Sequence, residues 1–363
     1  MGEFIAFQRR DFLYSQHSGV CKLSKITLKS IARELGVTHT TVSNAFNNPG
    51  KLSESLRKRI IDYAHSVNFY GPDNLGRALR TGKSDAIGII FNDTLSYVFT
   101  DSHDVQLMQG IAGECDRKGV SIILIPLHIG QGARASVINT AVDGYILNAT
   151  HNNDQIIAKA LSKNLPVVTT DFKIPSHSSV SIDNDRAMRE ICLHLLEKGH
   201  REFGIISFPS LQGRKGVMPL SQRVSGDNQV MITRVNACVA TFREWNIDLN
   251  KCFLCETNHH ETFGEIAARD LLISNPGITA FICLSDRFAQ GAINYCRKSG
   301  LSVPGNIAVT GFDNIHRPAD EIGLTTIAQD PVKKGEIAAA LLLEGKTNIH
   351  HDLEFRLIIR GST

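Results

Sequence analysis

The sequence predicts a small all-α domain followed by a two-lobed α/β body with parallel sheets. Residues 26–67 contain three short amphipathic segments, each preceded by a residue suited to cap a helix. From Asp85 onward, apolar strand-like runs alternate with helical patterns, as in parallel sheets covered by helices on both faces. This span is long for one doubly wound sheet, so we expect two lobes around a cleft, with ligands bound beyond the strand C-termini.

Four segments follow from this division: a leader (1–24), a helical domain (25–70), a linker (71–84) and the body (85–363). The leader lacks the apolar run and the cleavage site of a signal peptide. We expect it to be disordered, or to be present in the sequence because the start codon was assigned too early. No stretch reaches the roughly 18 apolar residues of a membrane span. The role of residues 1–24 stays open.

The cysteines indicate the compartment of the protein, and the charges indicate the kind of partner it binds. The eight cysteines are scattered singly, as expected for reduced thiols in a cytoplasmic protein. Cys252 and Cys255 form a lone CxxC, which we interpret as core packing, so we expect no metal and no cofactor. Residues 1–84 hold 13 Lys and Arg against 6 Asp and Glu, whereas the rest of the chain is mildly acidic. A basic N-terminal part suggests contact with a polyanion.

Three helices are predicted in the N-terminal domain. The first should begin after the N-cap Thr27 and end at Gly36, because its apolar residues share one face: Leu28, Ile31, Ala32 and Leu35. The second should begin after Thr38 and run through Phe46, and Ser53 should cap the third. Three short helices with a glycine turn between the first two are typical of a helix-turn-helix.

The second helix is crowded with polar residues that are mediocre helix formers. A recognition helix needs such residues, because it presents hydrogen-bonding groups and methyls to DNA bases. We expect His39, Thr40 and Asn44 to face base edges. Residues placed for phosphate contacts are Thr27, Thr38, Ser43, Asn47 and Lys51. The alternative is a small helical bundle with a polar face; the glycine turn and the basic charge favour DNA.

The linker contains a segment, 74–80, that makes fewer than two helical turns. Leu75 and Leu79 would share one face, beside Arg77 and Arg80. A helix this short is unstable alone. It should form only against a partner, and an apolar side chain beside arginines suits a minor-groove wedge. A flexible linker is the alternative; we favour a linker that becomes helical on DNA.

Residues 26–83 resemble the DNA-binding head and hinge of the lactose/galactose repressor family. The matching stretches are TLKSIARELGVTHTTVSNAFN, the helix after Ser53, and PDNLGRALRTGKS. The resemblance implies that Leu79 is the hinge leucine, that Tyr70 contacts the DNA backbone, and that a homodimer binds a near-palindromic operator. Asn44 replaces a common Arg, which leaves the operator sequence open, and Gly76 replaces a usual Ala, which should make the free hinge less helical.

In the body, strands and helices are expected to alternate. The expected strands are AIGIIF, VSIILIPL, DGYILNA, PVVTTDF, FGIISF, FLCET, AFICLS, IAVTGFD and LEFRLIIRGS. The expected helices lie near residues 103–118, 131–141, 154–163, 185–198, 233–245, 262–274 and 286–299.

The body resembles the effector domain of the same family, which shares its fold with periplasmic sugar-binding proteins. Its clearest marks include VDGYIL, LPVVTTDF, EKGHREFGII, LSDRFAQGAI and SVPGNIAVTGFDNI. The resemblance implies that Arg234 and Asp286 bind the effector. Further candidates at predicted strand ends are Phe99, Asp101, Asn148, Asp171, Asp183 and His259, for which turn chemistry is the alternative. We expect Asp313 to be structural. The stretch 208–233 is longer than the family's usual connection, and could cover the cleft or form a surface loop.

These patterns together predict a cytoplasmic transcriptional regulator, most simply a repressor, that binds double-stranded operator DNA. Its effector should be a small polar metabolite, either a sugar or a nucleoside-like compound. A cytosolic solute-binding protein without a DNA role is the alternative. An enzyme such as a sugar kinase is a third possibility, but no residues in the sequence point to it. The sequence leaves open the effector, the operator, the regulated genes and the sign of regulation.

Overall fold

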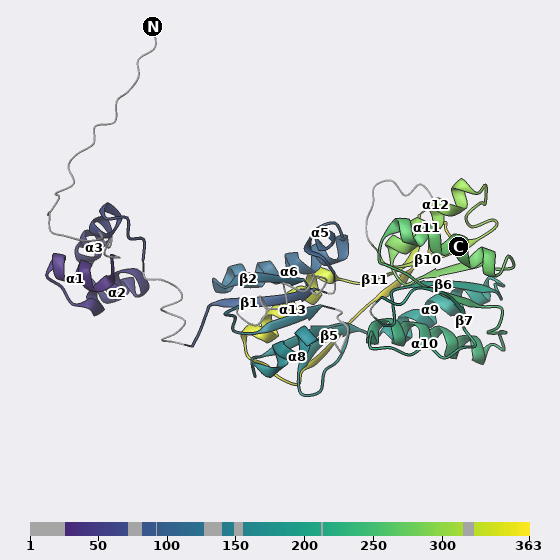
Figure 1. Cartoon of the computed structure of the whole chain (residues 1–363), viewed down its shortest axis with the longest axis horizontal. Helices are drawn as coiled ribbons and strands as arrows, with labels where there is room; N and C mark the ends of the chain where they lie inside the picture. Colours follow the sequence, from purple (N-terminus) through teal and green to yellow (C-terminus); the bar gives the residue numbers. More distant parts are fainter. Residues whose placement is uncertain are drawn as a thin grey trace, which may run out of the picture. The chain divides into compact units, whose positions relative to one another are not determined.

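The computed structural model describes residues 26–71, 82–91, 93–126, 140–148, 155–211, 213–314 and 323–363. The chain divides into two compact units, Met1–Thr81 and Gly82–Thr363, which are described separately (Figure 1). Among the residues described, no helix combines the length and the apolar character needed to span a membrane.

The first unit contains the predicted helices. They are α1 (Leu28–Leu35), α2 (His39–Asn47), a 3-10 turn η1 (Pro49–Lys51) and α3 (Glu54–Ser66). Thr27, Thr38 and Ser53 cap the three α-helices through their side chains, as expected. Gly36 ends α1 in the left-handed region at φ 65°, which glycine adopts without steric cost. The buried core joins all three helices: Ile31, Ala32, Val42, Ala45, Ile60 and Ala64.

The second unit has two lobes, each built on one sheet. The first lobe holds a six-stranded parallel sheet in the order β12-β5-β4-β3-β1-β2. Its strands are β1 (Ala86–Phe91), β2 (Ser121–Pro126), β3 (Tyr145–Asn148), β4 (Val167–Thr170), β5 (Ser178–Ile182) and β12 (His350–Leu353). Its helices are α5 (Leu95–Val98), α6 (Ser102–Lys118), α8 (Gln155–Ser162) and α13 (Pro331–Leu343).

The second lobe holds a seven-stranded sheet in the order β13-β11-β10-β9-β6-β8-β7, in which only the edge strands β7 and β13 are antiparallel. Its strands are β6 (Phe203–Ser207), β7 (Gly216–Pro219), β8 (Phe253–Glu256), β9 (Ala280–Cys283), β10 (Ala308–Asp313), β11 (Thr325–Ala328) and β13 (Arg356–Ile358). Its helices are α9 (Asn184–Glu197), α10 (Gln229–Glu244), α11 (Glu261–Ser274) and α12 (Asp286–Lys298).

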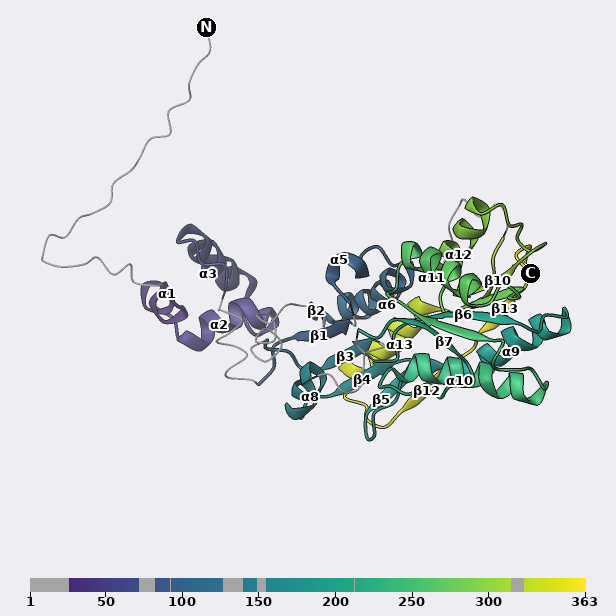
Figure 2. The same ribbon diagram turned by 45° about the vertical axis from the view of Figure 1, so that its right-hand side comes forward.

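Helices cover both faces of each sheet. In the second lobe α9 and α10 pack on one face and α11 and α12 on the other, and each pair encloses a separate apolar core (Figure 2). In the first lobe α6 and α13 share one core, and α8 lies over another. The alternation of strand and helix patterns therefore predicted the layered architecture correctly. Cys252 and Cys255 are buried free thiols in the second lobe, where Cys252 packs in the core under α9 and α10 and Cys255 in the core under α11 and α12.

Some elements differ from the expectation. The chain crosses between the lobes three times, after β5, after β11 and after β12. Figure 1 shows the result: α13, near the end of the chain, lies within the first lobe. Neither α13 nor the strands β5, β7, β11 and β12 were expected, and the closing run LEFRLIIRGS supplies only β13. The helix expected near 131–141 falls largely outside the described residues, and α10 begins four residues before its expected start at 233.

Candidate functional site

The second helix of the first unit presents the polar surface that the sequence predicted. Val42 and Ala45 are buried against the other helices, whereas Thr38, His39 and Thr40 are exposed. The exposed fraction falls for Ser43 and Asn44, which are half-buried. The N-terminal part of α2 therefore presents polar side chains at the surface.

Several of the residues expected at phosphates also stabilise the helices themselves. Thr27 and Ser30 form a reciprocal capping box, with Ser30 N donating to Thr27 Oγ1 at 3.2 Å. Thr38 Oγ1 accepts a hydrogen bond from Thr41 N at 3.1 Å. Asn47 donates to Ser43 Oγ at 3.3 Å. The bonds of Thr27 and Thr38 fix these side chains at the helix starts, where backbone N–H groups also favour anions, whereas the Asn47 bond lies at the end of α2.

The remaining predicted DNA contacts lie at the end of α2 or beyond it. Lys51 and Asn47 are exposed. Tyr70 is 74% exposed, with its ring 5.2 Å from that of His65. Leu79 lies outside the described residues.

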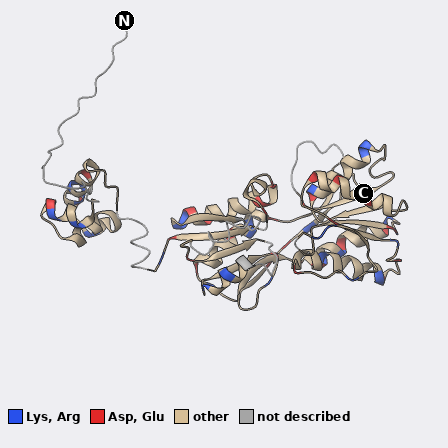
Figure 3. Cartoon of the chain, viewed as in Figure 1, with Lys and Arg blue, Asp and Glu red and all other residues tan. Residues whose placement is uncertain are grey.

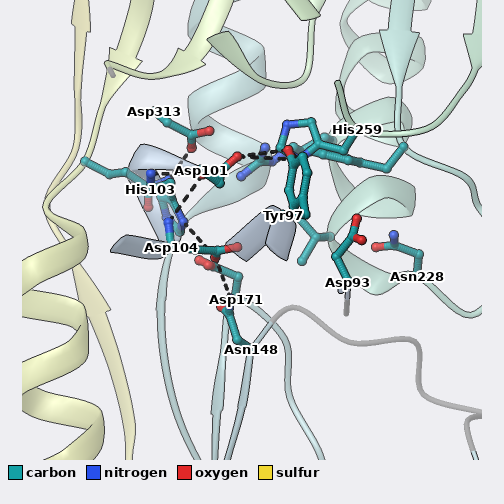
Figure 4. Close-up of a pocket in the computed structure, with 14 residues that line it drawn as sticks. Asp93, Tyr97, Asp101, His103, Asp104, Asn148, Asp171, Asn228, His259 and Asp313 are labelled. Atoms are coloured by element: carbon teal, nitrogen blue, oxygen red, sulfur yellow. Dashed lines mark hydrogen bonds and ion pairs between the residues drawn. The ribbon is translucent and has the colours of Figure 1, made fainter. Parts of the chain in front are cut away.

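A polar cavity lies between the lobes of the second unit, and Figure 4 shows the side chains around it. Its volume is about 130 Å³, similar to a cavity of about 150 Å³ that holds benzene. Residues of the first lobe in its wall are Asp93, Tyr97, Asp101, His103, Asp104, Asn148 and Asp171. Residues of the second lobe, and of the connection after it, are Phe208, Asn228, Val230, Arg234, His259, Asp313 and Gln329.

Five of the eight expected effector residues line this cavity: Asp101, Asn148, Asp171, Arg234 and His259. The other three do not. Phe99 is 62% exposed beyond α5, and Asp183 is occupied as the N-cap of α9, accepting from Arg186 N. Asp286 is buried behind the wall, where its carboxylate accepts a hydrogen bond from Thr326 Oγ1 at 2.6 Å.

Arg234 is held rigidly at the cavity. It projects from α10 and is buried, donating from Nε to Asn184 Oδ1 at 2.8 Å and from Nη1 to the Leu284 carbonyl at 2.8 Å. Its guanidinium lies 3.5 Å from the centroid of the Phe312 ring, a stacking geometry that suits arginine. Burial lowers the pKa of Arg234. One edge of the guanidinium is thus left to face the cavity.

A buried lysine neutralises Asp171. Lys334 Nζ, on α13, is fully buried and contacts both Asp171 oxygens at 2.6 and 2.7 Å. The same ammonium donates to Gln329 Oε1, whose amide in turn donates to Asp313 Oδ1 at 2.6 Å. Burial alone would raise the pKa of Asp171, but the Lys334 charge outweighs it and the pKa is lowered. This chain of contacts links α13 of the first lobe to β10 of the second.

A second set of contacts joins the lobes at the cavity rim, and we call it the interlobe bridge: Tyr97 and Asp101 from the first lobe, His259 and Arg287 from the second. Tyr97 Oη lies 2.7 Å from His259 Nδ1 and 3.0 Å from Asp101 Oδ2. Arg287 Nη1 lies 3.6 Å from Asp101 Oδ2. Burial lowers the pKa of His259 to about 4, so the ring is neutral at pH 7. Burial, together with the Asp101 charge, raises the pKa of Tyr97.

His103 and Asp104 form the floor of the cavity. His103 Nδ1 lies 3.7 Å from Asp104 Oδ1, and Asn148 donates to the same oxygen at 2.8 Å. Burial raises the pKa of Asp104. Burial would lower the pKa of His103, but contact with Asp104 and the charge of Asp313 outweigh it. His103 Nε2 is buried without a hydrogen-bond partner among the described residues, which is unusual for a polar atom and suggests a ligand partner.

The sequence alone did not identify most of the cavity wall. Tyr97, His103 and Asp104 lie at and just after the expected strand-to-helix connection, so their place after a strand was a usable signal. Asp313 was expected to be structural, and it does accept a bond from Gln329, but it also lines the cavity. No sequence pattern pointed to Lys334, because it lies on a helix that was not predicted.

The long stretch 208–233 contributes to the cavity wall rather than only to the surface. Phe208, Asn228 and Val230 line the cavity, and β7 and the start of α10 lie between and beyond them. Among the residues described, no three His, Cys, Asp or Glu side chains gather as a metal-ligand set.

Comparison with known proteins agrees with this division of the chain. Residues 27–72 match the model for bacterial regulatory proteins of the lacI family, and residues 192–363 match a periplasmic binding protein-like domain. An HTH-type transcriptional regulator of Mycolicibacterium smegmatis is 34% identical over 330 residues, covering 88% of this chain and 90% of its own. The chain belongs to the lacI family. It is therefore a transcriptional regulator with a helix-turn-helix DNA-binding domain.

Further comparisons cover most of the length of each protein. The regulator IpsA of Corynebacterium glutamicum is 32% identical over 331 residues, covering 88% of this chain and 90% of its own. A solved structure of a lacI-family regulator from Corynebacterium glutamicum has a TM-score of 0.66 at 27% identity, covering 93% and 98%. The lac repressor dimer bound to operator and the anti-inducer ONPF shares the fold, with a TM-score of 0.72 at 24% identity, covering 93% and 99%.

Proposed function

We propose that this regulator binds a near-palindromic operator as a homodimer in the cytoplasm, and that a small polar metabolite in the cavity controls its affinity for DNA. We assign DNA binding to residues 25–70, the hinge and linker to 71–84, and effector binding and dimerisation to 85–363. The observation that carries the proposal is a polar cavity between two lobes in the same chain as a helix-turn-helix. PurR repressors, 26% identical in the case of Aliivibrio salmonicida, support a repressor.

The roles on the DNA follow from exposure and chemistry. His39, Thr40 and Asn44 face base edges from α2, where an Asn amide matches an adenine edge and a Thr methyl matches thymine. The residues assigned to the DNA backbone are Thr27, Thr38, Ser43, Asn47, Lys51 and Tyr70. Leu79 is proposed as the hinge wedge.

The effector acts by changing how the lobes close. Arg234, Asp101, Asn148, Asp171 and His259 bind it from both lobes. A ligand held by both lobes favours one arrangement of them, and a marginal hinge helix converts a small shift into gain or loss of DNA affinity. The chain carries out no reaction in this scheme.

Selection of random double-stranded DNA on the purified protein tests the first half of the proposal. We expect a near-palindromic winner whose affinity falls steeply with salt, because phosphate contacts release counterions. Asn44→Ala should relax specificity at one base position per half-site by about 1–3 kcal/mol. No enrichment with or without metabolite pools would contradict the DNA role and favour a solute-binding protein.

A further inference from the structure

We infer that the cavity selects an uncharged, hydroxyl-rich ring and rejects the phosphorylated or carboxylated forms of the same ring. The inference rests on the proposed function, because it names the chemical class of the effector at that site. It follows from which charges line the cavity, which are already paired, and which polar atoms remain.

Carboxylates dominate the cavity wall. Five aspartates line it, and Figure 4 shows them around the same space: Asp93, Asp101, Asp104, Asp171 and Asp313. Two of these face buried cations, since Lys334 contacts Asp171 and Arg287 lies near Asp101. Arg287 is shared with Glu261, which it contacts at 2.9 Å. For the other three, the contacts found among the described residues are amides, a backbone N–H and the His103 ring, and the charge of Arg234 also acts on Asp313.

The one Lys or Arg side chain in the described wall is Arg234. Two of its three nitrogens are already committed to Asn184 and to the Leu284 carbonyl. Phosphate sites normally supply several N–H groups from arginines or from a helix N-terminus. A dianion here would meet one guanidinium edge and the His103 ring against five carboxyl groups, an excess of negative groups that acts against such ligands.

Hydroxyl groups suit what remains. A hydroxyl donates to a carboxylate and also accepts from an imidazole or guanidinium N–H. Carboxylate oxygens around the cavity offer acceptors, while His103 Nε2 is buried without a partner among the described residues and lines the same space. The cavity volume of about 130 Å³ fits one ring. Phe208 and Val230 supply apolar surface for the ring's C–H faces.

Calorimetric titration of the full-length protein tests the inference with matched pairs of ligands. The probes are pentoses, hexoses and cyclitols, each beside its own phosphate monoester and, where one exists, its uronic acid. We expect at least one neutral member to bind, and its phosphate ester to bind on the order of a hundredfold more weakly. Tighter binding of any phosphate or carboxylate than of its parent alcohol would overturn the inference.

Two variants test whether the charge selectivity arises in the cavity. Asp93→Asn removes one charge at a half-buried position and should narrow the gap between the alcohol and its phosphate several-fold. Asp116→Asn, at an exposed position near the end of α6, should leave the gap unchanged. An equal gap in wild type and Asp93→Asn would count against the electrostatic explanation, and Asp104→Asn then repeats the comparison at the cavity floor.

Failure of this inference is distinguishable from failure of the proposed function. Operator binding is measured with each ligand in parallel. If an anionic compound binds and shifts operator affinity, the proposed function stands and the inference fails. If operator DNA binds but no compound of either charge does, effector control by this ligand class is wrong, and the inference fails with it.

Discussion

At the scale of single residues, the pairing of Lys334 with Asp171 can be tested most directly. Lys334 is fully buried, and the partners of its ammonium within the described part of the chain are Asp171 and Gln329. Lys334→Met should therefore destabilise the body by about 3–5 kcal/mol, because it leaves a buried carboxylate without its cation. Urea unfolding measures the loss.

A double variant is the control for this prediction. Asp171 has a positive φ of 67°, which Asn tolerates, so Asp171→Asn keeps the backbone conformation. Combining it with Lys334→Met removes both charges and should recover most of the stability. A double variant as unstable as Lys334→Met alone would mean that Lys334 acts through packing and not through its charge.

His259 gives the body a pH dependence in a defined window. Burial lowers its pKa to about 4, whereas an unfolded histidine titrates near 6.5. Between these values the unfolded chain binds more protons, so stability falls as the pH drops from about 6.5 to 4, by up to about 3 kcal/mol. His259→Gln should flatten this part of a plot of unfolding free energy against pH.

Asp171 contributes to the pH dependence of stability in a lower pH range than His259, so the two contributions can be separated. Lys334 holds the pKa of Asp171 below its ordinary value. A carboxyl with a lowered folded pKa stabilises the protein above its unfolded pKa of about 3.9 and loses that contribution as the pH falls further. Because other groups also titrate between pH 4 and 6.5, the difference between the wild-type and His259→Gln curves isolates His259, and no difference between them over this range would contradict the burial of a neutral His259.

At the scale of elements, α6 and α13 pack unusually closely through glycines. A side chain on Gly110 would collide with the backbone of Val332, and one on Gly335 would collide with the backbone of Leu107. The two helices come from distant parts of the chain and share a core. Close approach of this kind needs residues without a Cβ on both sides.

Gly110→Ala should therefore separate α6 from α13 and destabilise the body by about 1–3 kcal/mol, as overpacking does. Gly113→Ala is a matched control on the same helix, since nothing lies within 4 Å of its added methyl. It should be neutral or stabilising by up to about 1 kcal/mol, because alanine favours helices. Thermal unfolding of both variants compares them directly, and equal destabilisation would argue against the collision.

The elements also show what the sequence can and cannot predict. Caps and 3.6-residue periodicity located α1, α2 and α3 nearly to the residue, because those signals are local. β5 reads SSVSI and β12 reads HHDL, and neither has the apolar run of a buried strand. These strands exist because a distant strand pairs with them. The cavity also depends on contacts between residues that are distant in the chain, because the sequence cannot show that Lys334 contacts Asp171.

At the scale of the whole regulator, charge is distributed unevenly. Figure 3 shows both signs scattered over the helices of the body. The basic excess lies in residues 1–84, the part that includes the helix-turn-helix. Binding to DNA and binding of the effector therefore depend on different electrostatics: an excess of cations in one unit, and carboxylates facing a cavity in the other.

Lobe closure in the second unit rests on the interlobe bridge as well as on three chain crossings. Tyr97 Oη contacts Asp101 of the first lobe and His259 of the second, so it connects the lobes. Tyr97→Phe removes this hydroxyl and leaves the ring. We expect a loss of about 1 kcal/mol, or roughly fivefold in the ratio of closed to open lobes.

Hydrogen–deuterium exchange of the full-length protein detects this opening. Amides around α5, and in the segment that leads into α11, should exchange faster in Tyr97→Phe, while those of the central strands stay protected. Tyr295→Phe, on α12 and away from the cavity, is the matched control and should exchange as the wild type does. Unchanged exchange in Tyr97→Phe would mean that the chain crossings and the contacts from Lys334 through Gln329 to Asp313 hold the lobes closed on their own.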